Sequence, residues 1–569
     1  MSHDATKNLN DVMRKYDRES ATRIWAGKPK IVISVVMALF SIYCIWSTLF
    51  STAALEIRLT AFLGLIVIMG YLTYPASKHH VRVNYLPWYD IVLMVVGAAC
   101  FFYFALNAMT LVRLSTRIET VHVIIGVVGI LILMELCRRC VGLPILCVAG
   151  VLIVYAFINQ LSYAGAVNGA TLYDALKTII YKLFYTTSGV IGTPINVCYT
   201  YIVLFIIFGA FLERTGIANF FISFANRLAG WSSGGPAKVA VISSALCGMV
   251  SGSSVGNTVT TGSFTIPMMK KTGYKPEFAG AVEAAASTGG QIMPPIMGAA
   301  AFLMAEITGI PYASIVVAAI LPAVLYFTGI FLMVHFEGKR LGLKGLPKDS
   351  IPHFFRLLAK SGYLLIPVVI LVICMNYYTA GMSACFAILF ALIISLIGRD
   401  KRDLLRSVGL PLIPLAVLVV LWQVIKIDTG TAVFVSMVVA VLCSFLTRSA
   451  ILSPRLVAEG LQGGAGSSIG VAVACAMAGI ISGVVSMTAL GTTLVAVIVP
   501  LAQKSVFLAL FCTMAACIVL GMGVPTTANY VIMATITAPI LIKMGLPTLA
   551  AHMFVFYFGI VADITPPVA

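Results

Sequence analysis

Long apolar runs separated by short polar segments follow one another along this chain. The clearest uncharged runs are 31–50, 91–112, 141–158, 183–212 and 307–334. As helices, these runs are long enough to cross the roughly 30 Å of hydrocarbon in a bilayer. The strands of a membrane barrel would instead alternate in segments of about ten residues, and the chain lacks that pattern. The sequence therefore predicts an all-α polytopic membrane protein.

Composition supports this class and restricts the function. Of 569 residues, 60% are hydrophobic and 10% are charged, and the mean hydropathy is +1.03, far from the values of soluble domains. The net charge of +17 comes from Lys and Arg in short loops. Basic loops at 78–82, 138–139, 339–360 and 399–406 all lie inside if the amino terminus is cytoplasmic. We therefore expect a bacterial inner-membrane protein, and no nucleic-acid binding.

The 13 cysteines lie mostly in apolar runs, where a thiol behaves as a small hydrophobic group. Cys137 and Cys140 form a CxxC pair, but no second ligand pair accompanies them as a zinc site would need. The first apolar run is too long for a signal peptide and lacks a cleavage site. We expect no disulfide framework, no cofactor and an uncleaved first span.

The loops divide the chain into three parts. Residues 1–140 are expected to form a small four-helix membrane domain with spans at 31–50, 59–76, 91–112 and 120–136. Residues 141–190 would be a linker span at 142–158, a polar stretch and an interfacial helix. Residues 191–569 would be a large transport domain, with repeats at about 191–335 and 461–569 and a scaffold region at 336–460.

An internal repeat joins 251–295 to 523–567 without a gap, at a constant offset of 272. Six identities fall into line, among them Asn257 with Asn529 and a Pro-Pro pair in each copy. Nine spans are expected between the copies, including separate ones at 461–481 and 483–503. Because nine is odd, the copies would be inverted, the arrangement typical of secondary transporters.

Each copy contains two predicted breaks. The first, 251–256 or 523–527, is polar and rich in small residues, and predicts the tip of a re-entrant helical hairpin. The second, 289–295 or 561–567, ends in Pro-Pro and predicts a discontinuous helix. The string at 252–256 also fits the G-x-S-x-G nucleophile motif, but no His and acid partners are evident and Thr526 replaces the nucleophile in the second copy.

These strings resemble the fused membrane subunit of tripartite ATP-independent periplasmic (TRAP) transporters, in the branch that uses TAXI-type binding proteins. The resemblance rests on GMVSGSSVGNTVTTGSFTIPMMKKTGY (248–274), STGGQIMPPIMGAAAF (287–302), GMGVPTTANYVI (521–532) and FGIVADITPPVA (558–569). It implies a four-span domain fused to a large domain that moves as an elevator, a periplasmic substrate-binding protein, and drive from a cation gradient without ATP.

The breaks supply the candidate site residues. For an anionic substrate these are Ser253, Ser254, Asn257, Thr261, Pro525, Thr526, Thr527 and Asn529. Hydroxyl, amide and unwound backbone oxygens suit a hard cation. The candidate cation ligands are Ser254, Asn257, Gly289, Gln291, Thr526, Asn529, Asp563 and Thr565. Asp563 and Glu283 are candidates for carrying a coupling proton, because carboxyls within a membrane are costly.

The sequence therefore predicts an elevator-type secondary transporter, not an enzyme, that imports a small organic anion such as a dicarboxylate or amino acid, coupled to Na⁺ or H⁺. The bound cations and hairpin N–H groups would meet the negative charge, so no intramembrane arginine is needed. Alternatives are a stand-alone carboxylate carrier and, less favoured, an intramembrane enzyme or channel. The second copy stops where the first continues into a further span, so we also expect a missing span at about 579–606.

Overall fold

The computed structural model describes residues 21–77, 82–114, 117–168, 171–345, 353–397, 404–446, 453–493, 495–496, 505–522 and 524–565. All regular secondary structure in these ranges is helical, which confirms the predicted all-α class. Nine of the described helices are long and apolar enough to cross a membrane. Large apolar side chains such as Leu106 (87% exposed) and Val317 (67% exposed) point away from the protein. These properties are those of a polytopic membrane protein.

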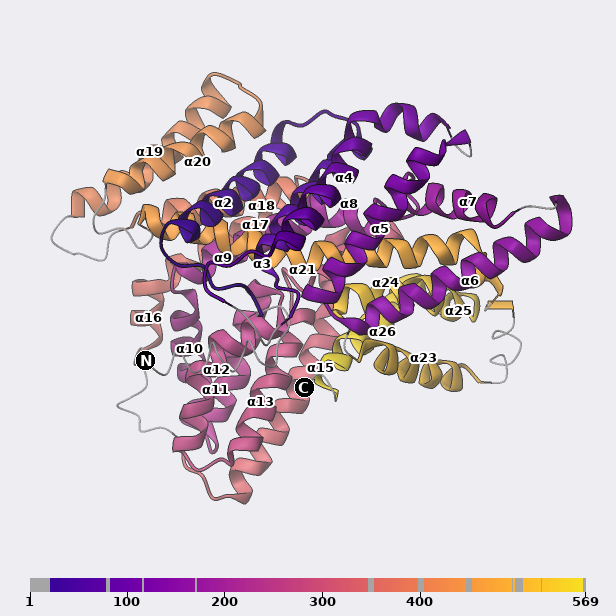
Figure 1. Ribbon diagram of the computed structural model, residues 1–569. Helices are drawn as coiled ribbons and strands as arrows, with labels where there is room; N and C mark the ends of the chain where they lie inside the picture. The colour runs from indigo at the N-terminus through magenta and orange to yellow at the C-terminus, as the bar shows by residue number, and fades with distance from the viewer. Residues whose placement is uncertain are drawn as a thin grey trace.

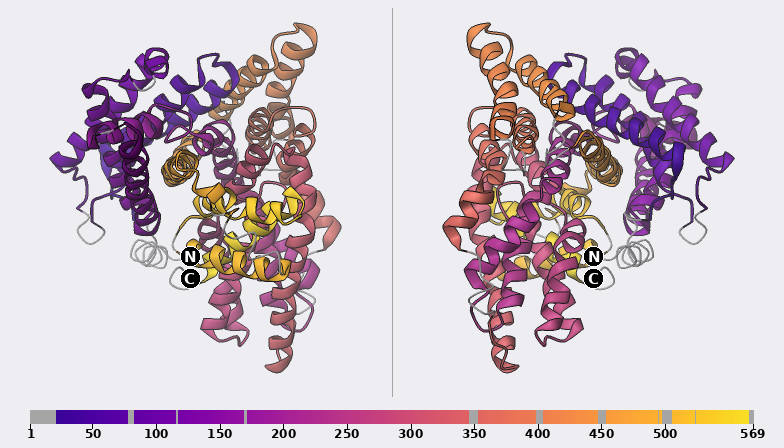
Figure 2. Two further views of the ribbon diagram at one scale, coloured as in Figure 1. Left: turned by 90° about the vertical axis from the view of Figure 1, so that its right-hand side faces the viewer. Right: turned by 90° about the vertical axis from the view of Figure 1, so that its left-hand side faces the viewer.

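Four helices at the amino-terminal end stand to one side of the molecule (Figure 2). They are α2 (Gly27–Phe50), α3 (Leu55–Thr73), α4 (Trp88–Leu114) and α5 (Thr120–Cys140), as the four predicted spans require. A buried ion cluster joins them. Asp90 is fully buried and pairs with Arg23 and, at 2.7 Å, with Arg139. The guanidinium of Arg139 also lies 4.8 Å over the ring of Tyr71, so the cluster ties the segment before α2 to α3, α4 and α5.

Two helices follow this group, α6 (Leu143–Asn168) and α7 (Leu172–Phe184). Helix α6 contains the predicted fifth span but continues through most of the polar stretch expected to follow it. Thr171 caps α7, and hydrogen bonds from its hydroxyl and N–H hold the pKa of Asp174 below its usual value. Helix α7 buries one side and exposes Lys182, a pattern that suits the interfacial position predicted for it.

A long central helix, α21 (Pro454–Met487), crosses the middle of the molecule (Figure 1). It runs without interruption through the break predicted between the spans 461–481 and 483–503, so that break was wrong, while part of 483–503 lies outside the described residues. The chain does not bend there, because Gly479 and Gly483 serve close packing: a Cβ on either would lie 2.4 Å from a backbone oxygen of Gly189 or Ser188. Helix α21 packs against α2, α3, α5, α6 and α7 and also against α9, and so joins the amino-terminal helices to the rest of the chain.

The first of the two repeated stretches follows a segment made of α8 (Thr193–Val197), η2 (Cys198–Ile202) and α9 (Val203–Arg214). Its elements are α10 (Ile217–Ala229), α11 (Gly235–Ser251), α12 (Ser254–Lys271), α13 (Pro276–Gly289), η3 (Gly290–Ile292), α14 (Ala299–Thr308) and α15 (Tyr312–Arg340). The chain leaves the helical conformation between α11 and α12 and again between η3 and α14. Both lie at predicted breaks.

The second repeated stretch contains α23 (Val506–Gly521), α24 (Thr526–Ile536), α25 (Ala538–Lys543), α26 (Thr548–Val561) and η7 (Ala562–Ile564). The offset of 272 relates its element boundaries to those of the first stretch. Helices α24 and α26 and the turn η7 begin 272 residues after α12, α13 and η3, and α26 and η7 also end 272 residues after α13 and η3. The predicted Pro-Pro break at 566–567 lies outside the described residues.

Between the two stretches lie α16 (Phe354–Ser361), η5 (Gly362–Leu365), α17 (Ile366–Cys374), α18 (Ala380–Ser395), α19 (Leu404–Val419), η6 (Val420–Val424) and α20 (Thr429–Leu446). Helix α18 packs against α9, α17 and α20, and α20 packs against α2. This group thus contacts the central and amino-terminal helices, as the predicted scaffold region would.

Candidate functional site

The first hairpin, α11 and α12, turns at Gly252 and Ser253. Gly252 has φ +63°, and a Cβ there would lie 2.5 Å from the carbonyl oxygen of Met297, so only glycine fits the turn. The hydroxyl of Ser253 accepts a hydrogen bond from the N–H of Gly256 at 3.2 Å and caps α12. The remaining N–H groups of the first turn of α12 leave partial positive charge at the tip.

Asn257, in the first turns of α12, is 1% exposed. Its Nδ2 donates to the carbonyl oxygen of Ser244 on α11 at 2.8 Å. Its Oδ1 is buried and has no hydrogen-bond partner among the described residues. Gly248 and Gly290 leave room for the amide: a Cβ on Gly248 would lie 2.4 Å from the Cα of Gly290.

Asn529 repeats this arrangement in the second hairpin, α23 and α24. It is fully buried, and its Nδ2 donates to the carbonyl oxygens of Cys517 at 3.2 Å and Gly559 at 3.5 Å. Its Oδ1 likewise has no partner within the described part of the chain. A buried acceptor without a partner costs about 1–3 kcal/mol, and the structure leaves two of them at matching positions. Such amide oxygens can coordinate a hard cation.

The two repeated stretches meet at Asp563. Its Oδ2 accepts hydrogen bonds from Gln291 Nε2 at 3.0 Å, Ser254 Oγ at 3.4 Å and Thr526 Oγ at 3.3 Å. Gln291 and Asp563 are separated by the offset of 272, and so are Ser254 and Thr526. The first residues of α12 and α24 therefore converge on one point, where two helix N-termini favour negative charge.

Glu283 on α13 lies in a separate, fully buried cluster of hydroxyl groups. Ser244 donates to its Oε1 at 2.6 Å and Ser287 at 3.0 Å, while Thr265 donates to its Oε2 at 2.5 Å. The hydroxyl of Thr261 also donates to Oε1, so Thr261 faces Glu283.

The second stretch does not repeat the Glu283 cluster. The aligned position for Glu283 is Val555, and those for Thr261 and Ser287 are Met533 and Gly559. Thr537 matches Thr265, but its hydroxyl bonds to the carbonyl of Met533 in its own helix. The cluster therefore distinguishes the first hairpin from the second.

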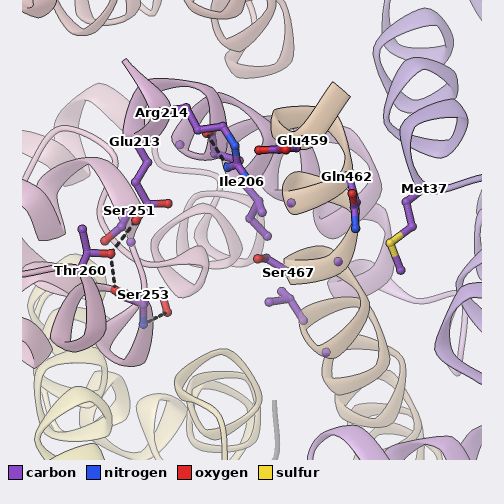
Figure 3. A pocket seen from close by; sticks show the side chains of 18 of the residues that line it. Met37, Ile206, Glu213, Arg214, Ser251, Ser253, Thr260, Glu459, Gln462 and Ser467 are labelled. Atoms are coloured by element: carbon purple, nitrogen blue, oxygen red, sulfur yellow. Dashed lines mark hydrogen bonds between the residues drawn. The ribbon is translucent and has the colours of Figure 1, made fainter. Parts of the chain in front are cut away.

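A cavity of about 1190 Å³ opens beside the first hairpin tip, between α12, α9, α21 and α2. Ser253, Asn257 and Thr260 of the hairpin line it, and Figure 3 shows Ser253 and Thr260. Thr260 Oγ donates to Glu213 Oε1 on α9 at 2.6 Å. Arg214, the next residue, also lines the cavity. The sequence analysis expected that no arginine is needed for the substrate and gave Arg214 no role.

The remaining predicted residues lie near the second tip and the breaks. Pro525 precedes the first residue of α24, and Thr527 is buried behind it. Gly289 ends α13 against the ring of Tyr326, where a Cβ would lie 2.3 Å from Cε1. Thr565 Oγ donates to the carbonyl of Ala562 at 2.7 Å.

The sequence pattern did not indicate Ser244, Thr265 and Ser287, nor Glu213 and Arg214. Helical spacing held a signal for some of them, because Thr261 and Thr265 share a face of α12, and Glu283 and Ser287 share a face of α13. Nothing in the spacing of Glu213 and Arg214 indicates the cavity that they line.

Comparison with known proteins gives several relatives. The large permease protein DctM of a C4-dicarboxylate TRAP transporter from Pseudomonas aeruginosa is 26% identical over 234 residues, 40% of this chain and 52% of the relative. The protein of the same name from Vibrio cholerae is 30% identical over 145 residues, 26% of this chain and 31% of that one. The large permease protein SiaM of a sialic acid TRAP transporter from Vibrio cholerae is 27% identical over 190 residues, 33% and 44% respectively.

The chain thus spans about half the length of these relatives, or less. The family model described as "Tripartite ATP-independent periplasmic transporter, DctM component" matches residues 128–409 and 399–569, which include both hairpins and both stretches around Asp563. This chain belongs to the DctM-component family of tripartite ATP-independent periplasmic transporters.

Proposed function

We propose that this chain is the membrane subunit of a secondary active transporter that imports a small organic anion, delivered by a periplasmic substrate-binding protein and driven by a cation gradient. The observation that carries this proposal is the pair of buried, unpartnered Oδ1 atoms of Asn257 and Asn529 at matching positions in two hairpins. Family membership supports transport, and the matching oxygens support cation coupling.

Each cation site would be completed by oxygens around the asparagine. In the first hairpin these would come from Ser254 and from Gly289 and Gln291, at the end of α13 and in η3. In the second hairpin, Thr526, Asp563 and Thr565 are the corresponding candidates. Hydroxyl, carbonyl and carboxylate oxygens are the ligands of hard cations, and we propose one site in each hairpin.

The substrate would lie between the sites, at the hairpin tips. The N-termini of α12 and α24 favour an anion there, with Ser253, Pro525 and Thr527 at the tips beside it. The named relatives act on C4-dicarboxylates and sialic acid, and all of these carry carboxylates. A carboxylate such as a dicarboxylate or amino acid is therefore the proposed substrate class.

An inverted arrangement of the two hairpins fits the described helices. Seven helical units lie between them up to Met487: α13 with α14, α15, α16 with α17, α18, α19, α20 and α21. The nine spans expected from sequence also counted 506–522, which is α23, an arm of the second hairpin. If each of the seven units crosses the membrane and 488–505 adds no further crossing, the hairpins would enter from opposite sides. This supports an elevator in which the hairpins and their breaks move past α9 and α21.

The remaining assignments follow from the same arrangement. Residues 1–140 would be the small domain fused to the transport domain, with 141–190 as linker and 336–460 as scaffold. The basic loops favour an amino terminus in the cytoplasm, with the chain in a bacterial inner membrane. The sequence strings favour a TAXI-type binding protein as the partner.

Two carboxyls are candidates for a coupling proton, Asp563 at the meeting point of the hairpins and Glu283 in the hydroxyl cluster. Asp563→Asn separates two roles. If Asp563 carries the proton, the variant should lose the pH dependence of uptake. If Asp563 is a Na⁺ ligand, the variant should instead need more Na⁺ for the same uptake rate.

Uptake in proteoliposomes, measured with and without a TAXI-type binding protein, tests the proposal. We expect uptake of a radiolabelled carboxylate that needs both the binding protein and an imposed Na⁺ or H⁺ gradient. Uptake that proceeds equally without the binding protein would indicate a stand-alone carrier. Flux that ignores both gradients and follows only the anion gradient would indicate a channel and contradict the proposal.

A further inference from the structure

Arg214, the last residue of α9, presents a guanidinium to the cavity without an acidic partner. The five N–H donors of its guanidinium make one long hydrogen bond, from Nη1 to the carbonyl of Ala210 at 3.4 Å. No ion pair of Arg214 occurs among the described residues. The neighbouring Glu213 accepts the hydroxyl of Thr260 on the hairpin and forms no ion pair with Arg214 in the described part of the chain.

The surface facing Arg214 is a stretch of α21 with little side chain. A Cβ on Gly463 would lie 3.4 Å from Nη1 and 3.5 Å from Nη2 of Arg214, and a Cβ on Gly466 would meet nothing within 4 Å. Gln462 and Ser467 flank this surface and line the cavity (Figure 3). The glycines leave space beside the guanidinium, and the amide and hydroxyl offer hydrogen bonds to a polar ligand.

The other charges of the cavity leave a positive balance. Glu459 is paired with Arg455 at 3.1 Å, and Glu213 holds the Thr260 hydroxyl. Lys30 on α2 also lines the cavity and has no ion pair in the described ranges. Glu213 keeps its negative charge while it accepts the hydroxyl of Thr260, so Arg214 and Lys30 leave the cavity one positive charge in excess.

We propose that Arg214, with the glycine face of α21 beside it, is a carboxylate-binding site inside the cavity that the first hairpin tip also lines. The inference rests on the proposed function and assigns one carboxylate of the transported anion to this position. A planar guanidinium binds a carboxylate through two parallel N–H···O bonds. Residues Gln462 and Ser467 would contact the rest of the anion.

Chemical protection tests binding at Arg214 directly. The full chain is placed in nanodiscs of phosphatidylcholine and treated with phenylglyoxal, and the modification of Arg214 and Arg455 is followed by peptide mass spectrometry. We expect succinate to slow modification of Arg214 by at least several-fold and to leave Arg455 unchanged. Succinamide, the neutral analogue, should protect neither residue. Equal modification of Arg214 with and without succinate would overturn the proposal.

A lipid phosphate is the other source of an anion for this guanidinium. In nanodiscs that contain phosphatidylglycerol, protection of Arg214 without succinate, and no further effect of succinate, would assign the site to a lipid headgroup and overturn the proposal. Protection by succinate in both lipid compositions supports it.

Two variants link the site to uptake. Arg214→Gln should raise the substrate concentration needed for half-maximal uptake about tenfold to a hundredfold, since one bidentate charge-assisted contact is lost. Arg214→Lys should restore part of this loss, whereas Arg340→Gln, which changes an exposed arginine outside the cavity, should change uptake little. Unchanged uptake by Arg214→Gln would contradict the inference and leave the cation sites standing. Loss of cation dependence in Asn257 and Asn529 variants tests those sites separately.

Discussion

The hydroxyl cluster around Glu283 can be tested by removing one of its hydroxyl groups. The second hairpin lacks the cluster, so the same substitution at the aligned position there serves as the control. Thr265 donates to Glu283 Oε2 at 2.5 Å, and Glu283 is fully buried. Thr265→Val keeps the side-chain shape but removes this donor, so the buried Oε2 of Glu283 loses its hydrogen bond from Thr265. The expected cost is about 1–3 kcal/mol in the free energy of unfolding.

Thr537→Val is the matched control, because Thr537 occupies the aligned position and is also buried. Its hydroxyl bonds only to the carbonyl of Met533, at 2.9 Å within its own helix. Loss of such a local bond costs about 1 kcal/mol or less. The losses in the free energy of unfolding should therefore differ by about 1–2 kcal/mol between the two variants, although both replace threonine with valine at aligned positions.

Thermal unfolding with a thiol-reactive fluorogenic dye measures the difference. Cys247 on α11 and Cys517 on α23 are buried, so unfolding exposes a thiol of each hairpin to the dye. In a chain of this length, 1 kcal/mol corresponds to on the order of 2 °C in Tm, or less. We expect Thr265→Val to lower Tm by more than Thr537→Val. Equal shifts, or a larger shift for Thr537→Val, would refute the assignment of the cluster to the first hairpin alone.

Two further substitutions test packing elsewhere. Asp90→Asn should destabilise the amino-terminal helices by about 3–5 kcal/mol because it leaves Arg23 and Arg139 buried without their acid. The exposed pair of Glu337 with Arg340 is the control, and Glu337→Gln should cost at most about 1 kcal/mol in the same thermal assay. Gly290→Ala should abolish uptake, because its Cβ would lie 2.5 Å from the Cα of Gly248. Gly280→Ala, in the same segment but with open space around it, should leave uptake intact.

The hairpins and breaks could be predicted from the sequence because each helix is interrupted by residues at the break itself. Glycine, serine and proline interrupt a helix through their own backbone chemistry, so Gly252 and the first Pro-Pro pair mark where α11 and η3 end. The repeat offset of 272 located matching elements because both copies use the same interruptions. The Asn257 and Asn529 pair followed from that alignment.

Features that depend on long-range packing could not be found this way. Gly479 and Gly483 resemble a helix break in sequence, but in the structure they let α21 approach the backbone at Ser188 and Gly189. Glu283 acquires its hydroxyl donors from α11 and α12 as well as its own helix, and only tertiary contacts select them. Arg214 was missed for the same reason, since the cavity beside it is bounded by three other helices.

The central claim is that Asn257 and Asn529 each hold a coupling cation. Uptake in proteoliposomes, with the Na⁺ and H⁺ gradients collapsed in turn, tests this claim most directly in the wild type and in Asn257→Ala and Asn529→Ala. We predict that collapse of one gradient stops wild-type uptake, and that each variant takes up substrate slowly and with weakened dependence on that cation. If both variants keep the wild-type uptake rate and cation dependence, the asparagines do not bind the coupling cation and the paired-site account is wrong.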